Sequence, residues 1–409
     1  MSLSLTLNET LNYDISKMGG ESVSRKPTAN VVDLFSGAGG LSLGAARAGF
    51  CVKGAVEIDP EAISSHKKNF PLTLHFQTDI STLNGNRLRD LFELHNGDLT
   101  GIIGGPPCQG FSSMGKNDTN DVRNSLFSGF FRIVSEAKPK FYLAENVPGI
   151  LKEKYSGIIR EAYSFVEEQY IMLPPLVLAA SDFGAPTTRT RVFFIGYRRD
   201  EMNPITRETL SYSEKETTHV KDALEGLPTL ISPTWQTEAE SWRVVEVAGN
   251  GFFASRLHGQ IPYGMGDPSA IERLKKERKV SGFLGTKHSK EVATRYANIE
   301  NGKSDPISKS YKLKPDGFCP TLRAGTGSDH GSFQAVRPLH PTEPRVITPR
   351  EAARLQGFPD WFQFPPTKWH SFRQIGSSVC PIIAEHILGT IRKAISPTLE
   401  GELLNEHKY

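Results

Sequence analysis

Between residues 30 and 199, short apolar runs alternate with helix-like segments, and this alternation constrains the fold more than any other feature. The run VVDLF leads into the glycine turn SGAGG and then into LSLGAARAGF, a small-residue helix closed by Gly49. The run CVKGAVE ends at Glu57, and Pro60 opens the next helix. The segments GIIGG (101–105) and KFYLAEN (140–146) repeat the form. Strands that alternate with helices predict an α/β fold with an open, mostly parallel sheet.

The pattern changes after residue 199. Residues 200–344 are rich in Gly, Ser, Thr and Pro, and regular structure returns only at Thr348. Residues 253–337 hold 15 Lys and Arg against 8 Asp and Glu, whereas the whole chain carries a formal charge of only +3. This local basic excess suits nucleic acid, although the run RLKKERK (273–279) is more typical of a solvated helix face. We expect three regions: a polar leader over 1–28, a discontinuous domain over 29–199 plus 345–409, and an irregular insertion over 200–344.

Composition and charge exclude several classes of protein. A charge of +3 excludes a strongly basic packaging protein. Four cysteines without a CxxC pair exclude a disulfide scaffold, and with 11 histidines that show no metal spacing we expect no metal site. The longest apolar stretch is interrupted by Pro174 and Pro175, so no membrane span is expected. The N-terminus lacks the features of a signal peptide, and we therefore expect a cytoplasmic protein.

The glycine turn after the first strand is a candidate ligand-binding loop. It spans Asp33 to Gly40, and its glycines allow the backbone to approach a ligand closely. Glu57 ends the next strand, where a carboxylate can accept hydrogen bonds from ribose hydroxyls. Because the dinucleotide fingerprint needs three spaced glycines, the loop fits an adenosine-type ligand without a pyrophosphate better. A plain turn at a helix start is the alternative.

Three further motifs place reactive side chains beside strands. Cys108 follows two glycines and two prolines in GGPPCQGFS, which hold it on a rigid loop, although a lone cysteine is more often a buried small hydrophobe. Glu145 ends a strand, where a carboxylic acid suits general acid chemistry if burial raises its pKa; a helix cap is the alternative. Arg189 and Arg191 are two residues apart, so in a strand they share one face and suit phosphate or carbonyl recognition; a solvated edge is the alternative.

In order and spacing, these motifs resemble those of the cytosine-5 DNA methyltransferase family. The resemblance extends to Asp79-Ile80, to RVITPREAARLQGFPDWF (345–362) and to QIGSSVCP (374–381), and covers well over half of the chain. It implies a Rossmann-like methyltransferase sheet with a smaller target-recognition domain inserted. The sequence departs from the family pattern twice: Thr187 stands where Gln is usual, and Ser377 stands where Asn is usual. Both changes remove an amide and leave the reactive groups intact.

The resemblance implies a DNA (cytosine-5-)-methyltransferase that uses S-adenosylmethionine, releases S-adenosylhomocysteine and needs no metal. The Cys108 thiolate would add to C6 of a flipped cytosine, because this addition makes C5 nucleophilic. Glu145 would bond N3 and the exocyclic amine, Arg191 would hold O2, and Arg189 would support the loop or a phosphate. The implied cofactor-binding residues are Phe35, Ser36, Gly37, Gly39, Glu57, Ile58, Asp79, Ile80, Pro107, Leu126, Ser377 and Val379. The implied DNA-binding residues are Gln109, Ser112, Thr321, Leu322 and Arg323.

The same resemblance implies double-stranded DNA as the partner, a monomeric protein, and host protection beside a cognate restriction endonuclease. A tRNA cytosine-5 methyltransferase is the first alternative, and the long insertion over 200–344 argues against it. A catalytically silent DNA-binding relative is the second, and intact Cys108, Glu145 and Arg191 argue against it. A nicotinamide-dependent oxidoreductase is the third, and the glycine spacing and the PPCQ loop disfavour it.

Overall fold

The computed structural model describes residues 28–95, 97–107, 124–211, 216–325 and 336–395. All but the last residue of the expected leader over 1–28 lies outside these ranges. The described residues form one central sheet of eight strands in the order β3-β2-β1-β4-β5-β8-β6, with β7 paired to β8. Its strands are β1 (Asn30–Leu34), β2 (Cys51–Glu57), β3 (Leu74–Gln77), β4 (Leu99–Gly104), β5 (Phe141–Asn146), β6 (Ile171–Met172), β7 (Leu176–Ala179) and β8 (Thr190–Tyr197).

Five neighbouring strands of this sheet are parallel. The strands β3, β2, β1, β4 and β5 run in one direction, whereas β8 is antiparallel to β5, β6 and β7. The predicted α/β class and mostly parallel sheet are therefore confirmed. Because parallel strands end at one edge of a sheet, Leu34, Glu57, Gly104 and Asn146 terminate their strands on the same side.

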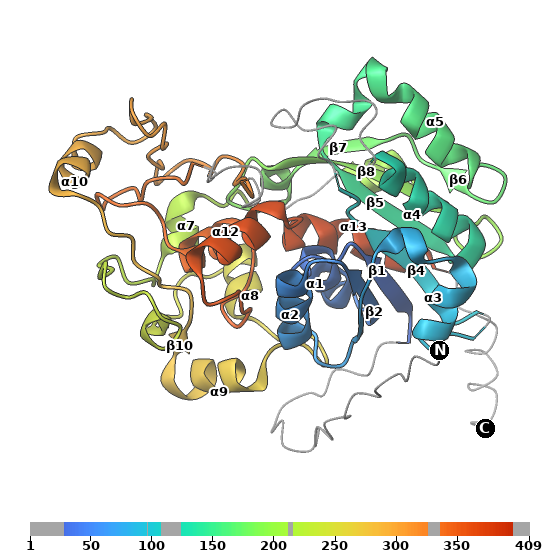
Figure 1. Cartoon of the computed structure of the whole chain (residues 1–409), viewed down its shortest axis with the longest axis horizontal. Coiled ribbons are helices and arrows are strands. Elements are labelled where there is room, and N and C mark those ends of the chain that lie inside the picture. Colours follow the sequence, from blue (N-terminus) through green and yellow to red (C-terminus); the bar gives the residue numbers. More distant parts are fainter. Residues whose placement is uncertain (1–27, 96, 108–123, 212–215, 326–335, 396–409) are drawn as a thin grey trace, which may run out of the picture.

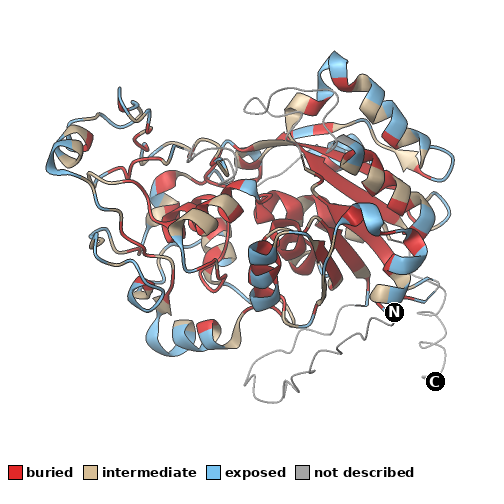
Figure 2. Cartoon of the chain, in the orientation of Figure 1, coloured by how far each residue is buried: buried red, intermediate tan, exposed pale blue. Residues whose placement is uncertain are grey.

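Helices cover both faces of the sheet (Figure 1), and the sheet residues are largely buried (Figure 2). Along β5, Phe141 and Leu143 join one apolar core, whereas Tyr142 and Ala144 join the other, as alternating strand side chains require. The first core includes residues of α1 (Gly40–Arg47) and α13 (Pro381–Ala394), and the second includes residues of α3 (Gly85–Leu91), α4 (Asn124–Ala137) and α5 (Ser156–Ser164). The other helices outside the irregular region are α2 (Pro60–Asn69), α11 (Pro349–Leu355) and α12 (Lys368–Ser377).

Short sequence signals set the starts of two helices. Pro60 occupies the first turn of α2, and the Asp59 carboxylate accepts hydrogen bonds from the backbone N–H groups of Glu61 and Ala62. Thr348 caps the N-terminus of helix α11, and Thr348 and Glu351 form a reciprocal capping box. Both helices therefore begin where the sequence predicted. Helix α2 starts at Pro60, and α11 starts directly after Thr348.

The last helix packs on the first. A Cβ added to Gly44 of α1 would lie 2.4 Å from the Cβ of Ala384 on α13, so the two backbones approach closely only because residue 44 has no side chain. This contact joins segments about 340 positions apart and places the chain after α12 beside the loop after β1.

The region between β8 and α11 forms short helices and a two-stranded sheet, on the left in Figure 1. Its elements are α6 (Arg207–Ser211), α7 (Val220–Leu224), α8 (Phe252–His258), α9 (Pro268–Glu277), α10 (Lys290–Ala297), β9 (Arg243–Val244) and β10 (Lys279–Val280). Two small apolar clusters support it, one around Phe283 and one around Tyr296. None of the helices in the described ranges is long and apolar enough to cross a membrane.

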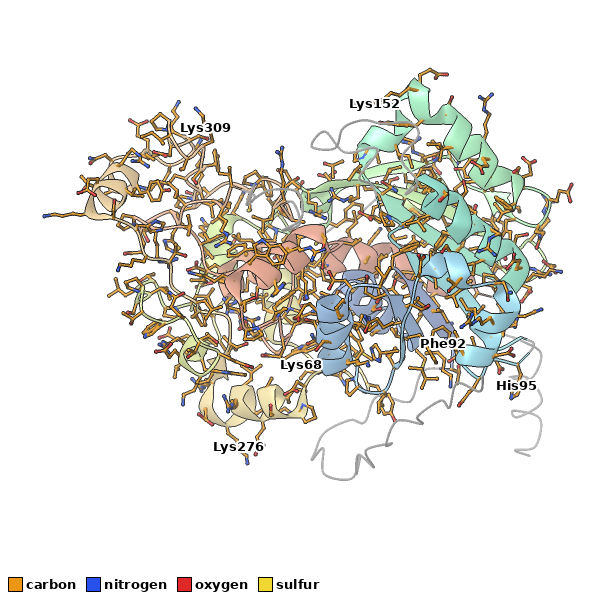
Figure 3. The ribbon with its side chains drawn as sticks, viewed as in Figure 1. Lys68, Phe92, His95, Lys152, Lys276 and Lys309 are labelled. Carbon is orange, nitrogen blue, oxygen red and sulfur yellow. The ribbon has the colours of Figure 1, made fainter. Side chains whose placement is uncertain are left out.

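The basic run at 273–279 forms the C-terminal half of α9 and continues into β10. Residues 275–278 are exposed, and the Lys276 side chain points outward (Figure 3). Lys276 Nζ lies 2.6 Å from Glu272 Oε1, one helical turn away. The prediction of a solvated helix face is confirmed.

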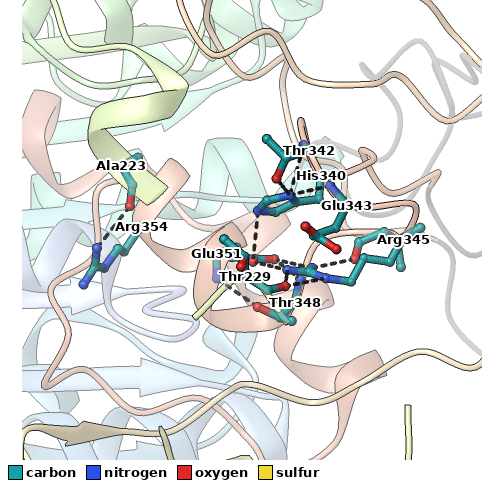
Figure 4. A network of polar contacts seen from close by, with 10 residues as sticks. Ala223, Thr229, His340, Thr342, Glu343, Arg345, Thr348, Glu351 and Arg354 are labelled. Carbon is teal, nitrogen blue, oxygen red and sulfur yellow. Dashed lines mark hydrogen bonds and ion pairs between the residues drawn. The ribbon is translucent and has the colours of Figure 1, made fainter. Parts of the chain in front are cut away.

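Two arginines, the half-buried Arg345 and the buried Arg354, join the irregular region to α11 (Figure 4). Arg345 donates hydrogen bonds of 2.7 and 2.9 Å to the two carboxylate oxygens of Glu351 and one of 2.9 Å to the carbonyl of Thr229. Arg354 donates a hydrogen bond of 3.3 Å to the carbonyl of Ala223. Because Glu351 is only 1% exposed, removal of Arg345 would leave a buried carboxylate without its bidentate partner.

Candidate functional site

A cavity of about 260 Å³ lies at the edge where the parallel strands end. It is lined by the loop after β1 and the start of α1, the ends of β2 and β5, the loops after β3 and β4, α4, and the end of α12 with the segment that follows it. The lining residues are Phe35, Ser36, Gly37, Gly40, Leu41, Val56, Glu57, Ile58, Thr78, Asp79, Ile80, Gly105, Pro107, Leu126, Glu145, Ser377, Ser378 and Val379. Of the residues expected to bind the cofactor, all except Gly39 line this cavity.

The glycines of the first loop have different roles. Gly37 has a φ of 54° and lines the cavity with no neighbouring atom within 4 Å of an added Cβ. Gly39 has a φ of 103°, and a Cβ there would lie 2.3 Å from the Phe70 ring. The absence of a side chain at Gly39 therefore lets the Phe70 ring pack against the loop. Gly40, which the sequence analysis did not single out, would place a Cβ 2.3 Å from the Val379 carbonyl. Its lack of a side chain lets the start of α1 contact the segment after α12.

Glu57 connects the end of β2 to the loop after β1. Its carboxylate accepts hydrogen bonds from the backbone N–H groups of Gly37 (2.8 Å), Ile58 (2.8 Å) and Asp59 (2.9 Å). Burial raises the pKa of Glu57, and these hydrogen bonds oppose the shift. A carboxylate has about four lone-pair sites, so one acceptor site remains for a ligand in the cavity.

Two other residues of the cavity point to a polar ligand. Ser36 is 7% exposed, and among the residues that the structure describes its buried Oγ has no hydrogen-bond partner. Phe35 is a non-glycine residue with a φ of 61°, a conformation that functional loops often contain. A buried hydroxyl without a partner beside a half-buried aromatic ring suits a ligand that has both a polar and a flat apolar part.

Glu145 and Arg191 form an ion pair at the same edge, with Arg191 Nε 2.7 Å from Glu145 Oε1. The second carboxylate oxygen, Oε2, lies 3.1 Å from the position of a Cβ added to Gly105. It therefore faces the loop that leads to Cys108. Asn146 donates a hydrogen bond of 3.3 Å to the carbonyl of Pro106 in that loop. Asn146 was not among the predicted site residues, although it follows Glu145 directly at the end of β5 and could have been found there.

Cys108, Gln109 and Ser112 lie outside the described residues. Pro107, the last described residue before them, lines the cavity. The chain thus enters the segment of the predicted nucleophile from the cavity that also contains Glu145 and Glu57.

Arg189 is buried, and its guanidinium contacts the backbone of two distant segments. It is 2% exposed and donates hydrogen bonds to the carbonyls of Leu322 (3.1 Å) and Ser377 (3.2 Å). These bonds fit the predicted supporting role better than contact with a phosphate. Thr187, at the position of the usual Gln, is also buried, and its Oγ1 accepts a hydrogen bond of 3.3 Å from the Arg189 backbone. Ser377 Oγ donates a hydrogen bond to the Gln374 carbonyl.

The three described residues that were expected to contact DNA differ in exposure. Leu322 is 6% exposed and belongs to a buried core, so its side chain packs inside the protein. Thr321 is half-buried, and Arg323 is exposed. Of these three residues, only Arg323 presents an exposed side chain to a partner.

A buried polar chain below the first loop was not identified from the sequence. Ser42 Oγ donates a hydrogen bond of 2.6 Å to Asp33, His66 Nε2 lies 3.0 Å from Ser42 Oγ, and His66 Nδ1 lies 2.8 Å from His75 Nε2. Burial raises the pKa of Asp33 to about 7 and lowers the pKa of His66 well below its usual value. The four residues come from four elements, so no local pattern pointed to them.

Known proteins were compared with the whole chain. The family described as "C-5 cytosine-specific DNA methylase" matches residues 29–393. Type II methyltransferase M.XorII of Xanthomonas oryzae pv. oryzae is 39% identical over 91% of this chain and 87% of its own length. Type II methyltransferase M.DdeI of Desulfomicrobium norvegicum is 33% identical over 87% of this chain and 86% of its own length.

Two solved structures support the same fold. A prophage-encoded protein of E. coli is 52% identical and superposes with a TM-score of 0.81, covering 90% of this chain and 99% of its own. The S. pombe Dnmt2 methyltransferase is 17% identical, with a TM-score of 0.57 over 89% of this chain and 98% of its own, and shows the fold alone. The family match spans most of the chain and includes every element that forms the cavity. The protein therefore belongs to the C-5 cytosine-specific DNA methylase family.

Proposed function

We propose that the protein transfers a methyl group from S-adenosylmethionine to C5 of a cytosine flipped out of duplex DNA. The observation that carries this proposal is that one cavity contains both Glu57, suited to a ribose, and Glu145, paired with Arg191 and suited to a pyrimidine edge. Methyl transfer requires the cofactor and the base to lie side by side, and Glu57 and Glu145 lie at the same edge of the sheet.

The cavity residues fit the cofactor. The buried Ser36 hydroxyl, which has no partner within the described ranges, and the remaining acceptor site of Glu57 offer hydrogen bonds, and Phe35 offers an aromatic ring for the adenine. Asp79, whose Oδ1 accepts a hydrogen bond of 2.9 Å from Ser81, lines the same cavity and would bond the exocyclic amine. When bound, S-adenosylmethionine supplies an activated methyl group and leaves as S-adenosylhomocysteine.

The residues of this chain would activate and hold the base. The Cys108 thiolate adds to C6, and Glu145 supplies a hydrogen bond and a proton at N3, so that C5 becomes nucleophilic. Arg191 holds O2 and keeps Glu145 in place. After C5 has accepted the methyl group, its proton passes to water, the Cys108–C6 bond breaks to restore the thiolate, and the N3 proton returns to Glu145.

Duplex DNA is the proposed substrate, and host protection in restriction-modification is the proposed role. The relatives M.XorII and M.DdeI are named type II methyltransferases, and they cover most of this chain. A cognate endonuclease would then recognise the same DNA sequence. The basic excess over 253–337 supplies positive charge for the backbone of a duplex.

Transfer of radiolabelled methyl groups to duplex DNA and to tRNA tests this function. We expect label in duplex DNA at one sequence and none in tRNA, and sequencing of methylated cytosines identifies that sequence. A duplex with 5-fluorocytosine at the target should trap a covalent adduct, because fluorine cannot leave as a proton does. The Cys108→Ala variant should form no adduct. Label only in tRNA would contradict the proposed substrate, and a trapped adduct with the Cys108→Ala variant would contradict the proposed nucleophile.

A further inference from the structure

A narrow groove beside the candidate site is lined by basic side chains. A cavity of about 20 Å³ marks it, between two segments of the irregular region and helix α12. Its lining residues are Leu322, Arg323, Ala324, Val336, Arg337, Pro338, Trp369 and Phe372. None of them is acidic, and two are arginines.

Arg337 is a half-buried cation that lies beside an aromatic ring. Its guanidinium lies over the Phe372 ring, 4.1 Å from the ring centroid. Among the residues that the structure describes, no Asp or Glu forms an ion pair with it, in contrast to Arg345 with Glu351 and Arg354 with Asp360. Burial lowers the pKa of Arg337. A cation that is partly removed from water in this way is stabilised when an anion binds to it.

Two other cations accompany Arg337. Lys368, on the first turn of α12, donates hydrogen bonds to the Gly285 carbonyl and to Thr286 Oγ1, which are neutral groups. Burial and the positive charge of Arg337 both lower the pKa of Lys368, and the next residue of α12, Trp369, lines the groove. Arg323 is exposed on the same groove, and within the described part of the chain no carboxylate pairs with it or with Lys368.

The groove lies next to the proposed base site. The Arg189 guanidinium contacts the carbonyl of Leu322, which lines the groove, and the carbonyl of Ser377, which lines the cofactor cavity. A Cβ on Gly376 would lie 2.5 Å from the carbonyl carbon of Arg323, so α12 and this segment are in direct contact. A nucleotide held by Glu145 and Arg191 would therefore have its backbone near these cations.

We propose that Arg337, Arg323 and Lys368 bind a phosphate of the DNA backbone beside the target cytosine. The inference rests on the proposed function, since duplex DNA is the source of the phosphate. A guanidinium fork stacked on an aromatic ring binds a phosphate with two parallel hydrogen bonds, and a nearby ammonium adds charge. Such a contact positions the DNA without reading its sequence.

The salt dependence of DNA binding tests this proposal. The probe is a fluorescent duplex with the sequence that the methylation assay identifies, titrated between 50 and 300 mM NaCl in the presence of S-adenosylhomocysteine. Loss of one phosphate contact reduces the slope of log K against log salt by about 0.9. We expect this reduction in Arg337→Gln, a slope close to wild type in Arg337→Lys, and an unchanged methylated sequence in both.

Arg392→Gln is the matched control. Arg392 of α13 also stacks on a phenylalanine, at 5.8 Å from the Phe50 centroid, but Phe50 precedes β2 and so lies at the opposite edge of the sheet. This variant should keep the wild-type slope. If Arg337→Gln melts at a lower temperature than wild type, the exposed Arg323→Gln takes its place and should show the same reduction.

The outcomes separate this inference from the proposed function. Wild-type slopes in folded Arg337→Gln and Arg323→Gln, with duplex DNA still methylated, would overturn the phosphate site alone. Methylation of tRNA and not of duplex DNA by the wild type would overturn the proposed function, and the DNA phosphate site with it.

Discussion

Arg191 Nε lies 2.7 Å from Glu145 Oε1, and the two side chains are 13% and 11% exposed. The pair is therefore screened from bulk solvent, while Glu145 still lines the cofactor cavity. The contact occupies one carboxylate oxygen and leaves the other for a substrate. An arginine in this position orients the carboxyl group and, in the proposed mechanism, would hold O2 of the base.

Glu145→Gln should lower the rate of methyl transfer by about 10²–10⁴-fold, because an amide cannot supply the proton at N3. Single-turnover kinetics with saturating DNA measures this rate, and the affinities for DNA and S-adenosylhomocysteine should change little. Glu272→Gln, in an exposed pair with Lys276 on α9, is the matched control and should keep the full rate. A wild-type rate in Glu145→Gln would remove Glu145 from the chemistry.

Glu57→Gln should weaken binding of S-adenosylhomocysteine about tenfold, or about 1.4 kcal/mol. The carboxylate accepts three backbone hydrogen bonds, and a glutamine has a single acceptor oxygen, so the loop after β1 loses its support. Isothermal titration calorimetry provides the affinity. Glu61→Gln on the exposed side of α2 should bind as wild type does; an equal loss in both variants would argue against a specific role for Glu57.

Gly44→Ala should reduce the free energy of unfolding by about 1–3 kcal/mol. The new methyl group would lie 2.4 Å from the Ala384 Cβ and would force α1 and α13 apart. Urea unfolding at constant pH measures the difference. Gly389→Ala on α13 is the control: nothing lies within 4 Å of its added Cβ, so alanine should be neutral or stabilise the helix by up to about 1 kcal/mol. Equal stability of both variants would show that the helices do not pack this closely.

Asp33 should make stability fall as pH rises from about 4 to 7. Burial raises its folded pKa to about 7 from the ordinary 3.8, so the folded protein binds a proton that the unfolded chain releases. The contribution is complete below the unfolded pKa and is lost on approach to the folded pKa. Asp33→Asn removes this pH dependence. The free energy of unfolding of the variant, relative to that of wild type, should therefore rise by a few kcal/mol between pH 5 and pH 8. Urea unfolding across this range provides the comparison, and a constant difference would exclude a buried proton on Asp33.

Local sequence signals determined much of the fold. The apolar run ending at Glu57 is strand β2, Pro60 begins α2, and the segment from 140 to 146 contains β5. Each depends on a few adjacent residues, and the carboxyl ends of parallel strands then bring the motif residues to one edge. This is why nearly all residues expected around the cofactor line a single cavity.

Long-range contacts could not be predicted in the same way. The bonds from Arg189 to Leu322 and Ser377 span 133 and 188 positions, and nothing in the sequence specifies such partners. The apolar stretch around Pro174 and Pro175 divides into β6 and β7, and both pair with β8. The roles of Gly39 and Gly40 also depended on distant atoms, on the Phe70 ring and the Val379 carbonyl, respectively.

The contact of Gly40 with Val379 has a consequence for the order of synthesis. A ribosome that has made β1 to β8 has produced a sheet whose cofactor cavity still lacks one side, since Ser377, Ser378 and Val379 are translated only after the whole irregular region. A chain that ends prematurely within 200–344 therefore contains Glu145 and Arg191 but no complete cavity. Under the proposed function, a truncated product of this kind lacks both a complete cofactor site and part of the region proposed to bind DNA, so we expect it to be inactive.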